Sequence, residues 1–178
     1  MLESELLFPV ARHFESHGLR AIAEVPVAGR RADLVAIGED LVAVELKVSE
    51  WRQAERQAVA YQVWAPYAYV ALPFARAMQA VRHRHRFEAD RVGLLAVLDC
   101  DVRTFVPAGE SPRLFPALTD LVRRQLTSSA LSLDAFPLAS GERFYGVPAC
   151  SAGEQPCPPN SSSQKGNSSG RAPAARTR

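Results

Sequence analysis

The chain of 178 residues is poor in cysteine and, over most of its length, in lysine. Its three cysteines are odd in number and match no metal-binding or redox spacing. A disulfide framework is therefore not expected, and a reducing cytoplasm is the predicted location. The first residues are acidic where a secretory signal is basic, so we expect no export. The chain also has no glycine-rich phosphate loop and no serine-nucleophile motif, which argues against enzymes built on either.

Uncharged runs long enough to cross a membrane are also lacking, with one near exception. Residues 58–75 contain no charged side chain, which is close to the length of a membrane-spanning helix. Pro66 and Pro73 interrupt this run, and Gln62 and three tyrosines add polar groups. The run is better explained as the end of a helix, a turn and a buried strand, and we expect no membrane partner.

Residues 151–178 contain no Val, Ile, Leu, Met, Phe, Tyr or Trp. Such a segment cannot bury enough apolar surface to offset its chain entropy, so it is predicted to be a disordered tail. It carries a net charge of +3, whereas residues 1–150 carry −1. The sequence therefore predicts one folded domain over residues 1–150, and its bulk charge does not by itself indicate a nucleic-acid binder.

Hydrophobic periodicity predicts alternating helices and strands over residues 1–150. A first helix ends before Gly18, with Pro9 kinking it or delaying its start, and Ser49 is a candidate cap for the second. The last helix is expected to bury one face formed by Leu118, Leu121, Val122 and Leu126. The expected strands are 19–27, with Pro26 marking an edge, 32–37, 41–47, 67–72, 92–98 and 102–106; the later helices are 49–65, 74–87 and one from 116.

The predicted order is α-β-β-β-α-β-α-β-β-α, an α/β fold. Strands linked through helices tend to lie parallel, while the short turn between residues 37 and 41 requires an antiparallel hairpin. We therefore expect a mixed β-sheet flanked by helices.

The second and third predicted strands carry charged side chains among apolar ones. Glu45 and Lys47 are two residues apart and so share one face of their strand. A tight hairpin would bring Asp33 of the preceding strand near Glu45, and two adjacent carboxylates favour binding of a divalent cation. The alternative is a structural ion-pair cluster in an unrelated α/β domain, in which Asp33 and Glu45 need not meet.

Lys47 is the only lysine before residue 151, against sixteen arginines. This bias indicates a need for a compact ammonium group, which can place a water molecule or a phosphate oxygen. A structural Glu–Lys pair on a sheet face is the competing explanation.

Gln57 and Tyr61 lie four residues apart, on one face of the predicted second helix. Ala54 and Ala58 flank them and would let this face approach the sheet closely. Tyr61 as a core aromatic, with Gln57 as a partly buried spacer, is the alternative.

Three segments together resemble the PD-(D/E)XK nuclease superfamily, and more narrowly its branch with a QxxxY motif. They are RADLV at 31–35, VELK at 44–47 and QAVAY at 57–61. The resemblance covers roughly residues 3–98 and implies a restriction-endonuclease-like core of α-β-β-β-α-β order. This chain has Ala32 where the family name has proline.

The resemblance also implies a chemistry. Asp33 and Glu45 would hold Mg²⁺ or Mn²⁺ with the backbone carbonyl of Leu46, and Lys47 would orient or activate the attacking water. Phosphodiester hydrolysis requires such a set, because a metal must polarise the phosphoryl oxygen and acidify a water molecule. Many members add an acidic ligand from the first helix, for which Glu3 is the preferred candidate.

Other residues are assigned less directly. Glu5 is the reserve for Glu3, because Pro9 makes the helical phase uncertain, and an acidic first turn favoured by the helix dipole explains either. Gln57 and Tyr61 would support the site or contact the nucleic-acid backbone. Arg31 would contact a phosphate or pair with a neighbouring acid.

The expected function is therefore metal-dependent hydrolysis of phosphodiester bonds, with DNA as substrate and a homodimer as a further expectation. The main alternative is a non-catalytic module that uses the same fold to bind nucleic acid or a protein. The complete set of site residues argues against this alternative, and the near-neutral charge of the folded region argues against strong stand-alone affinity for DNA.

Overall fold

The computed structural model describes residues 2–134, so the predicted disordered tail lies outside the described residues. The elements in chain order are α1 (Glu3–Ser16), β1 (Arg20–Val27), β2 (Arg30–Ile37), β3 (Leu41–Leu46), α2 (Trp51–Tyr61), β4 (Tyr67–Pro73), α3 (Phe74–Ala80), the 3₁₀ helix η1 (Val81–His83), α4 (Arg84–Asp90), β5 (Val92–Leu98), β6 (Asp101–Val106) and α5 (Pro116–Asp134). Every predicted strand is present within one or two residues of its expected bounds.

The six strands form one mixed open sheet in the order of the chain, β1-β2-β3-β4-β5-β6. The central strands β3, β4 and β5 are parallel, and the connections between them carry the helices α2, α3 and α4. The outer pairs are antiparallel hairpins. The predicted α/β fold with flanking helices is confirmed, and β1, which contains Pro26, is an edge strand as expected.

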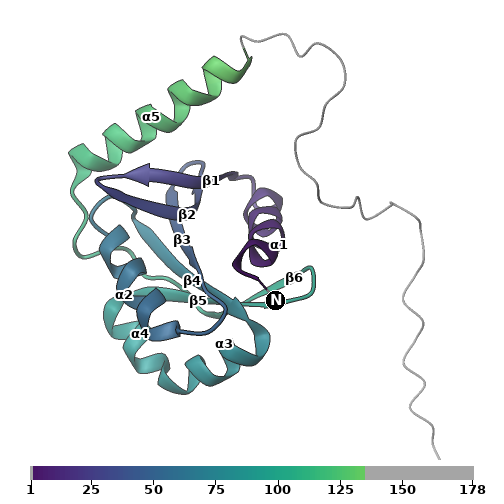
Figure 1. Cartoon of the computed structure of the whole chain (residues 1–178). Coiled ribbons are helices and arrows are strands. Elements are labelled where there is room, and N and C mark those ends of the chain that lie inside the picture. The colour runs from purple at the N-terminus through teal and green to yellow at the C-terminus, as the bar shows by residue number, and fades with distance from the viewer. Residues whose placement is uncertain (1, 135–178) are drawn as a thin grey trace, which may run out of the picture. The chain divides into compact units, whose positions relative to one another are not determined.

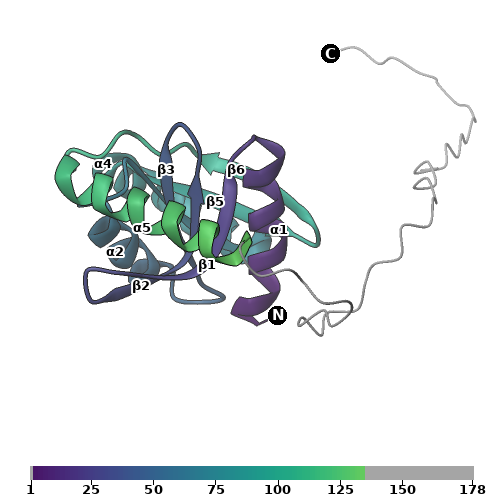
Figure 2. The ribbon, with the colours of Figure 1, turned by 90° about the horizontal axis from the view of Figure 1, so that it is seen from above.

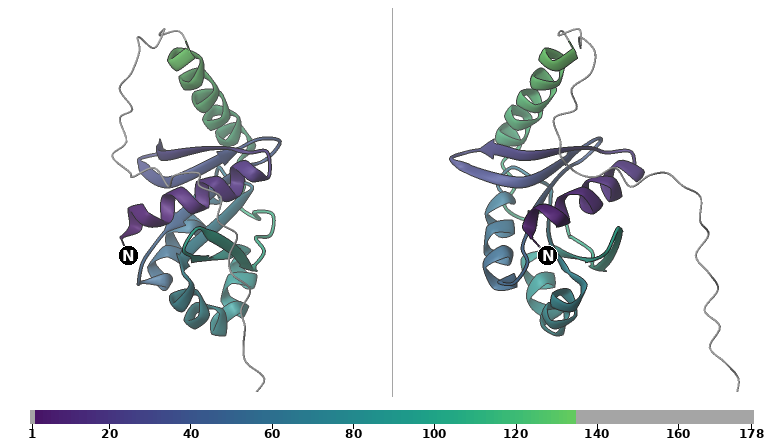
Figure 3. Two further views of the ribbon diagram at one scale, coloured as in Figure 1. Left: turned by 90° about the vertical axis from the view of Figure 1, so that its right-hand side faces the viewer. Right: turned by 45° about the vertical axis from the view of Figure 1, so that its right-hand side comes forward.

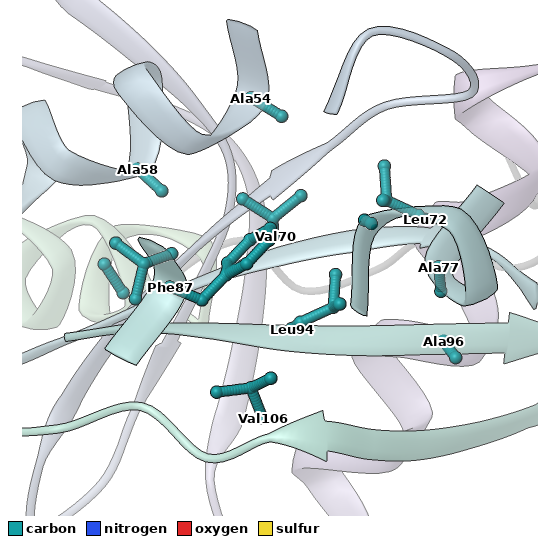
Figure 4. Close-up of a cluster of buried hydrophobic side chains, with 12 residues drawn as sticks. Ala54, Ala58, Val70, Leu72, Ala77, Phe87, Leu94, Ala96 and Val106 are labelled. Atoms are coloured by element: carbon teal, nitrogen blue, oxygen red, sulfur yellow. The ribbon is translucent and has the colours of Figure 1, made fainter. Parts of the chain in front are cut away.

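Helices cover both faces of the sheet, with α1 on one face and α2, α3 and α4 on the other (Figures 1 and 3). Leu6, Val10 and Phe14 of α1 pack on β2, β3 and β5. On the opposite face, small residues of α2 and α3 allow close packing around Phe87 of α4 (Figure 4). Ala54 and Ala58 are fully buried there, so the predicted close approach of this helix face to the sheet is confirmed.

Helix α5 packs along the β1–β2 hairpin (Figures 1 and 2). Val122 and Leu126 are buried and Leu118 is partly buried in this contact. Arg123 donates hydrogen bonds to the carbonyls of Gly38 and Glu39 at 2.7 and 2.9 Å, which ties the helix to the β2–β3 turn. Leu121 is 53% exposed, so its assignment to the buried face was wrong. The reason is that α5 buries a narrower stripe of side chains against the β1–β2 hairpin than its hydrophobic periodicity suggests.

Three local predictions are also corrected. The helix expected over 74–87 is broken by the 3₁₀ turn η1 into α3 and α4. The helix expected over 49–65 ends at Tyr61, and its N-cap is Glu50, without a side-chain cap from Ser49. Helix α1 begins at Glu3 and continues through Pro9, which is buried against the core. Among residues 2–134, no helix has both the length and the apolar character needed to span a membrane.

Candidate active site where strands β2 and β3 separate

Strands β2 and β3 part at the two predicted carboxylates. Their antiparallel register runs from Ile37 opposite Leu41 to Leu34 opposite Val44, and Asp33 and Glu45 come next on each strand. Beyond this point β3 stays paired with β4 through Leu46. The sequence has no proline or glycine at the separation, so we attribute the parting of the strands to the buried polar groups rather than to a backbone breaker.

Asp33 closes the gap between the strands. Its Oδ2 accepts a 2.8 Å hydrogen bond from the backbone N–H of Leu46, replacing a ladder bond. The N–H and C=O of a strand residue point to the same side, so the carbonyl of Leu46 also lies on the side of Asp33. The N–H of Lys47, one residue on, instead bonds the carbonyl of Ala71 in β4 at 3.1 Å.

Glu45 is a carboxylate held almost out of solvent. Only 3% of the residue is exposed, and its Oε2 accepts a 2.6 Å hydrogen bond from the Tyr61 hydroxyl. Burial raises the pKa of Glu45 to about 7; the Tyr61 hydrogen bond opposes this shift, and the charge of Asp33 adds to it. The protonated form of this carboxyl group is therefore favoured over a wider pH range than in solvent.

Tyr61 links this carboxylate to the backbone of β2. Its hydroxyl also lies 3.0 Å from the carbonyl oxygen of Arg31. Burial and the neighbouring Glu45 raise the pKa of Tyr61, so it remains a neutral donor. Because a hydroxyl has one proton, Tyr61 donates either to Glu45 or to the carbonyl of Arg31 at any one time.

Lys47 lies beside the same site, and its side chain is 22% exposed. Its Nζ is 3.1 Å from Glu3 Oε1 at the start of α1. Burial lowers the pKa of Lys47, but the hydrogen bond and charge of Glu3 outweigh this effect and raise it. Lys47 is therefore a permanent cation in this arrangement, able to donate a hydrogen bond but not to act as a base.

The charges around Asp33 are unbalanced. Burial raises the pKa of Asp33 and the Leu46 hydrogen bond lowers it; among the charged groups, Glu3 and Glu24 raise this pKa and Lys47 lowers it. Glu24 lies on β1 with a positive φ of 58°, and the β1–β2 register omits both Glu24 and Asp33. Sequence reasoning missed Glu24, because nothing in the residues of β1 signals this backbone conformation.

The remaining predicted residues take different places. The Gln57 Oε1 atom is buried and, within residues 2–134, has no hydrogen-bond partner. Arg31 is exposed and pairs with Glu24 at 2.5 Å, which is the ion-pair alternative for this residue. Glu5 accepts a hydrogen bond from the N–H of Leu2, so it closes the first turn of α1 while Glu3 reaches the site.

The oxygen atoms at this site are of the chemical type that small divalent cations bind. Asp33 and Glu45 supply hard carboxylate oxygens whose mutual repulsion a cation would relieve, and the Leu46 carbonyl lies on the same side. Within the described part of the chain, however, no three His, Cys, Asp or Glu side chains converge closely enough to form a metal cage. Glu3, the predicted third ligand, is paired with Lys47 instead.

Comparisons of this chain with models of known families, with curated proteins and with solved structures give no match.

Proposed function

We propose that this protein is a metal-dependent nuclease with a restriction-endonuclease-like core, and that DNA is its substrate. The observation that carries the proposal is the proximity of Asp33 and Glu45 where β2 and β3 separate, with Lys47 directly after the end of β3. The resemblance of segments 31–35, 44–47 and 57–61 to the PD-(D/E)XK superfamily supports it. An unrelated structural cluster would not require the two carboxylates to meet.

Each residue would have a distinct role. Asp33 and Glu45 would hold Mg²⁺ or Mn²⁺, with the Leu46 carbonyl as a third oxygen. The bound cation would supply a polarised phosphoryl oxygen and a more acidic water molecule. Lys47, a permanent cation, would donate to the phosphate or the water. Tyr61 would hold Glu45 in place through its 2.6 Å hydrogen bond.

Two observations favour a second candidate, a module of the same fold that binds nucleic acid or protein without cleaving it. Lys47 is paired with Glu3, and no third acidic ligand joins Asp33 and Glu45 within residues 2–134. The two candidates differ in one property. A nuclease requires a cation at the two carboxylates, whereas a binding module does not.

The test is cleavage of labelled linear and branched DNA with Mg²⁺, Mn²⁺ or Ca²⁺. Asp33→Asn, Glu45→Gln and Lys47→Ala should abolish metal-dependent cleavage. Asp101→Asn, an exposed carboxylate on β6, is the matched control and should cleave like the native protein. Calorimetry should show metal binding that both carboxylate variants lose. Cleavage that survives Lys47→Ala, or that no metal stimulates, would contradict the proposal.

A further inference from the structure

A second cluster of polar and aromatic side chains lies at the N-terminal end of α2, where α2 meets η1 and α4. The Trp51 ring stacks on His83, with ring centroids 5.1 Å apart and an angle of 23° between the planes. The Arg52 guanidinium lies over the Trp51 ring at 4.6 Å, and that of Arg86 at 5.7 Å. We call Trp51, Arg52, His83 and Arg86 the Trp51 patch. It joins residues more than thirty positions apart in sequence.

The cations of this patch differ in how they are balanced. Arg86 donates two hydrogen bonds to Glu55, at 2.9 and 3.3 Å, so its charge is compensated. Arg52 is exposed and has no ion pair within residues 2–134. Trp51 and His83 are both only partly buried. The patch thus presents an exposed guanidinium without an ion pair beside a partly buried aromatic pair.

We propose that the Trp51 patch binds single-stranded nucleic acid, with Arg52 against a phosphate and a base against the Trp51–His83 pair. Aromatic rings with interleaved cations are the chemistry that single strands require, since every base has a stacking face and every nucleotide a phosphate. A duplex keeps its bases stacked internally and would use only the guanidinium. The combination of aromatic rings and guanidinium groups in the Trp51 patch therefore favours a single strand over a duplex.

The position of the patch relates it to the candidate active site. Helix α2 begins at Trp51 and ends at Tyr61, so the ten helical steps between these residues place them about 15 Å apart along the helix axis. Lys47 precedes Trp51 by four residues at the end of β3. A strand held by the patch would thus run along α2 toward Glu45. In this respect the inference rests on the proposed function, and it names the form of substrate that the site receives.

Fluorescence offers a direct test, because Trp51 and Trp64 are the chain's two tryptophans and Trp64 is buried. The full chain carrying Lys47→Ala, which prevents cleavage, and Trp64→Phe reports on Trp51 alone. It is titrated with a twenty-residue oligo(dT), with the same oligomer made abasic, and with a duplex of equal length. Anisotropy of the labelled nucleic acid gives affinity at several salt concentrations. Circular dichroism confirms that each variant is folded.

We expect oligo(dT) to quench Trp51 emission, and the abasic oligomer and the duplex to bind more weakly without quenching. Arg52→Glu should weaken oligo(dT) binding about tenfold and reduce the salt slope by about one. Arg103→Glu, the same charge change on exposed β6, should alter affinity less than twofold. Equal binding of the duplex, absence of quenching, or equal effects of the two variants would overturn the inference.

The inference and the proposed function fail separately. Metal-dependent cleavage by the native chain, together with an Arg52→Glu variant that binds normally, rejects the patch and retains the nuclease. Quenching by oligo(dT) without any metal-dependent cleavage retains the patch and rejects the nuclease.

Discussion

Two glutamates in this protein are equally buried but differently compensated. Glu55 on α2 is 1% exposed and receives both hydrogen bonds of Arg86, which joins α2 to α4. Glu45 on β3 is 3% exposed and receives a hydroxyl hydrogen bond from Tyr61. The charged groups that act on it are Asp33 and Glu3, which have the same sign, and Lys47, which has the opposite sign.

This difference in charge compensation distinguishes a structural ion pair from a candidate ligand-binding site. A buried carboxylate with its own guanidinium is electrostatically complete and holds two helices together. A buried carboxylate beside a second carboxylate is incomplete, and a cation from solution is the natural way to complete it. Glu45 is therefore the position where ligand chemistry is expected, although burial alone does not distinguish it from Glu55.

The largest expected difference between the two glutamates is in catalysis. If the proposed function holds, Glu45→Gln should lower metal-dependent cleavage by about a thousandfold or more, about 4 kcal/mol in activation free energy, because it removes a proposed metal ligand. Glu55→Gln should retain cleavage within about tenfold when assayed well below its melting temperature. Single-turnover rates at saturating Mg²⁺ measure both. Equal losses in the two variants would mean that Glu45 has only a structural role.

The next effect is on stability. Arg86→Met leaves the Glu55 carboxylate buried without its cation and should lower the free energy of unfolding by about 3 kcal/mol. Replacing both residues, Glu55→Met with Arg86→Met, should recover most of this loss, since no buried charge then remains. Urea denaturation of the three proteins measures the effect. A double variant as unstable as Arg86→Met would show that packing, rather than charge, is lost.

Replacing Glu45, unlike replacing Arg86, should increase the free energy of unfolding of the metal-free protein. Its folded-state pKa of about 7 lies above the unfolded value, so its protonated form is favoured by folding. The associated stability is complete below about pH 4.5 and is lost as pH rises toward 7 and beyond. Glu45→Gln should therefore stabilise the metal-free protein at pH 8 by about 1–2 kcal/mol, after allowance for solvent screening. Chelator-treated protein unfolded at pH 5 and pH 8 tests this sign, and a variant less stable than the native chain at pH 8 would contradict it.

Removing the Tyr61 hydroxyl should have a smaller effect. The Tyr61 hydrogen bond lowers the pKa of Glu45, so Tyr61→Phe should raise this pKa further. The proposed metal would have to displace this proton, so the pH midpoint of metal binding should move upward by up to about one unit. Calorimetric Mg²⁺ titrations between pH 6 and pH 9 follow the shift.

Tyr67 on β4 provides the matched control for this variant. It is not among the groups that shift the pKa of Glu45, so Tyr67→Phe should leave the midpoint of metal binding unchanged. A midpoint that stays in place in Tyr61→Phe, or that moves equally in both variants, would show that the Tyr61 hydroxyl does not act on this carboxylate.

The smallest expected effect concerns the ion pair between Glu3 and Lys47. Glu3 is 45% exposed at its side chain, and its ion pair with Lys47 is screened by water. Glu3→Gln should change the free energy of unfolding by less than about 1 kcal/mol. If Glu3 only balances Lys47, metal affinity should also change less than twofold. A tenfold loss of Mg²⁺ affinity would instead assign Glu3 to the metal, as the family resemblance implies.

The central strands of the sheet could be predicted from the sequence because they are buried on both faces. Residues 92–98 and 67–72 are continuous apolar runs bounded by turn residues, and such runs specify their strands locally. The break of the helix over 74–87 was not predicted, because this segment contains no glycine or proline that would signal it. The exposed position of Leu121 likewise depends on how much of α5 the β1–β2 hairpin covers.

For the site, the sequence alone determined the residue types and their faces: Asp33, Glu45 and Lys47 on neighbouring strands, and Tyr61 on the following helix. The period of two along a strand and the short turn between β2 and β3 are local properties, so they can be derived from spacing. Only the tertiary structure decided the charge balance. Whether Glu3 faces a metal or Lys47, whether Arg86 compensates Glu55, and whether Trp51 meets His83 depend on side chains far apart in the chain. Electrostatic energies depend on such distances and on burial, and neither is encoded in local sequence.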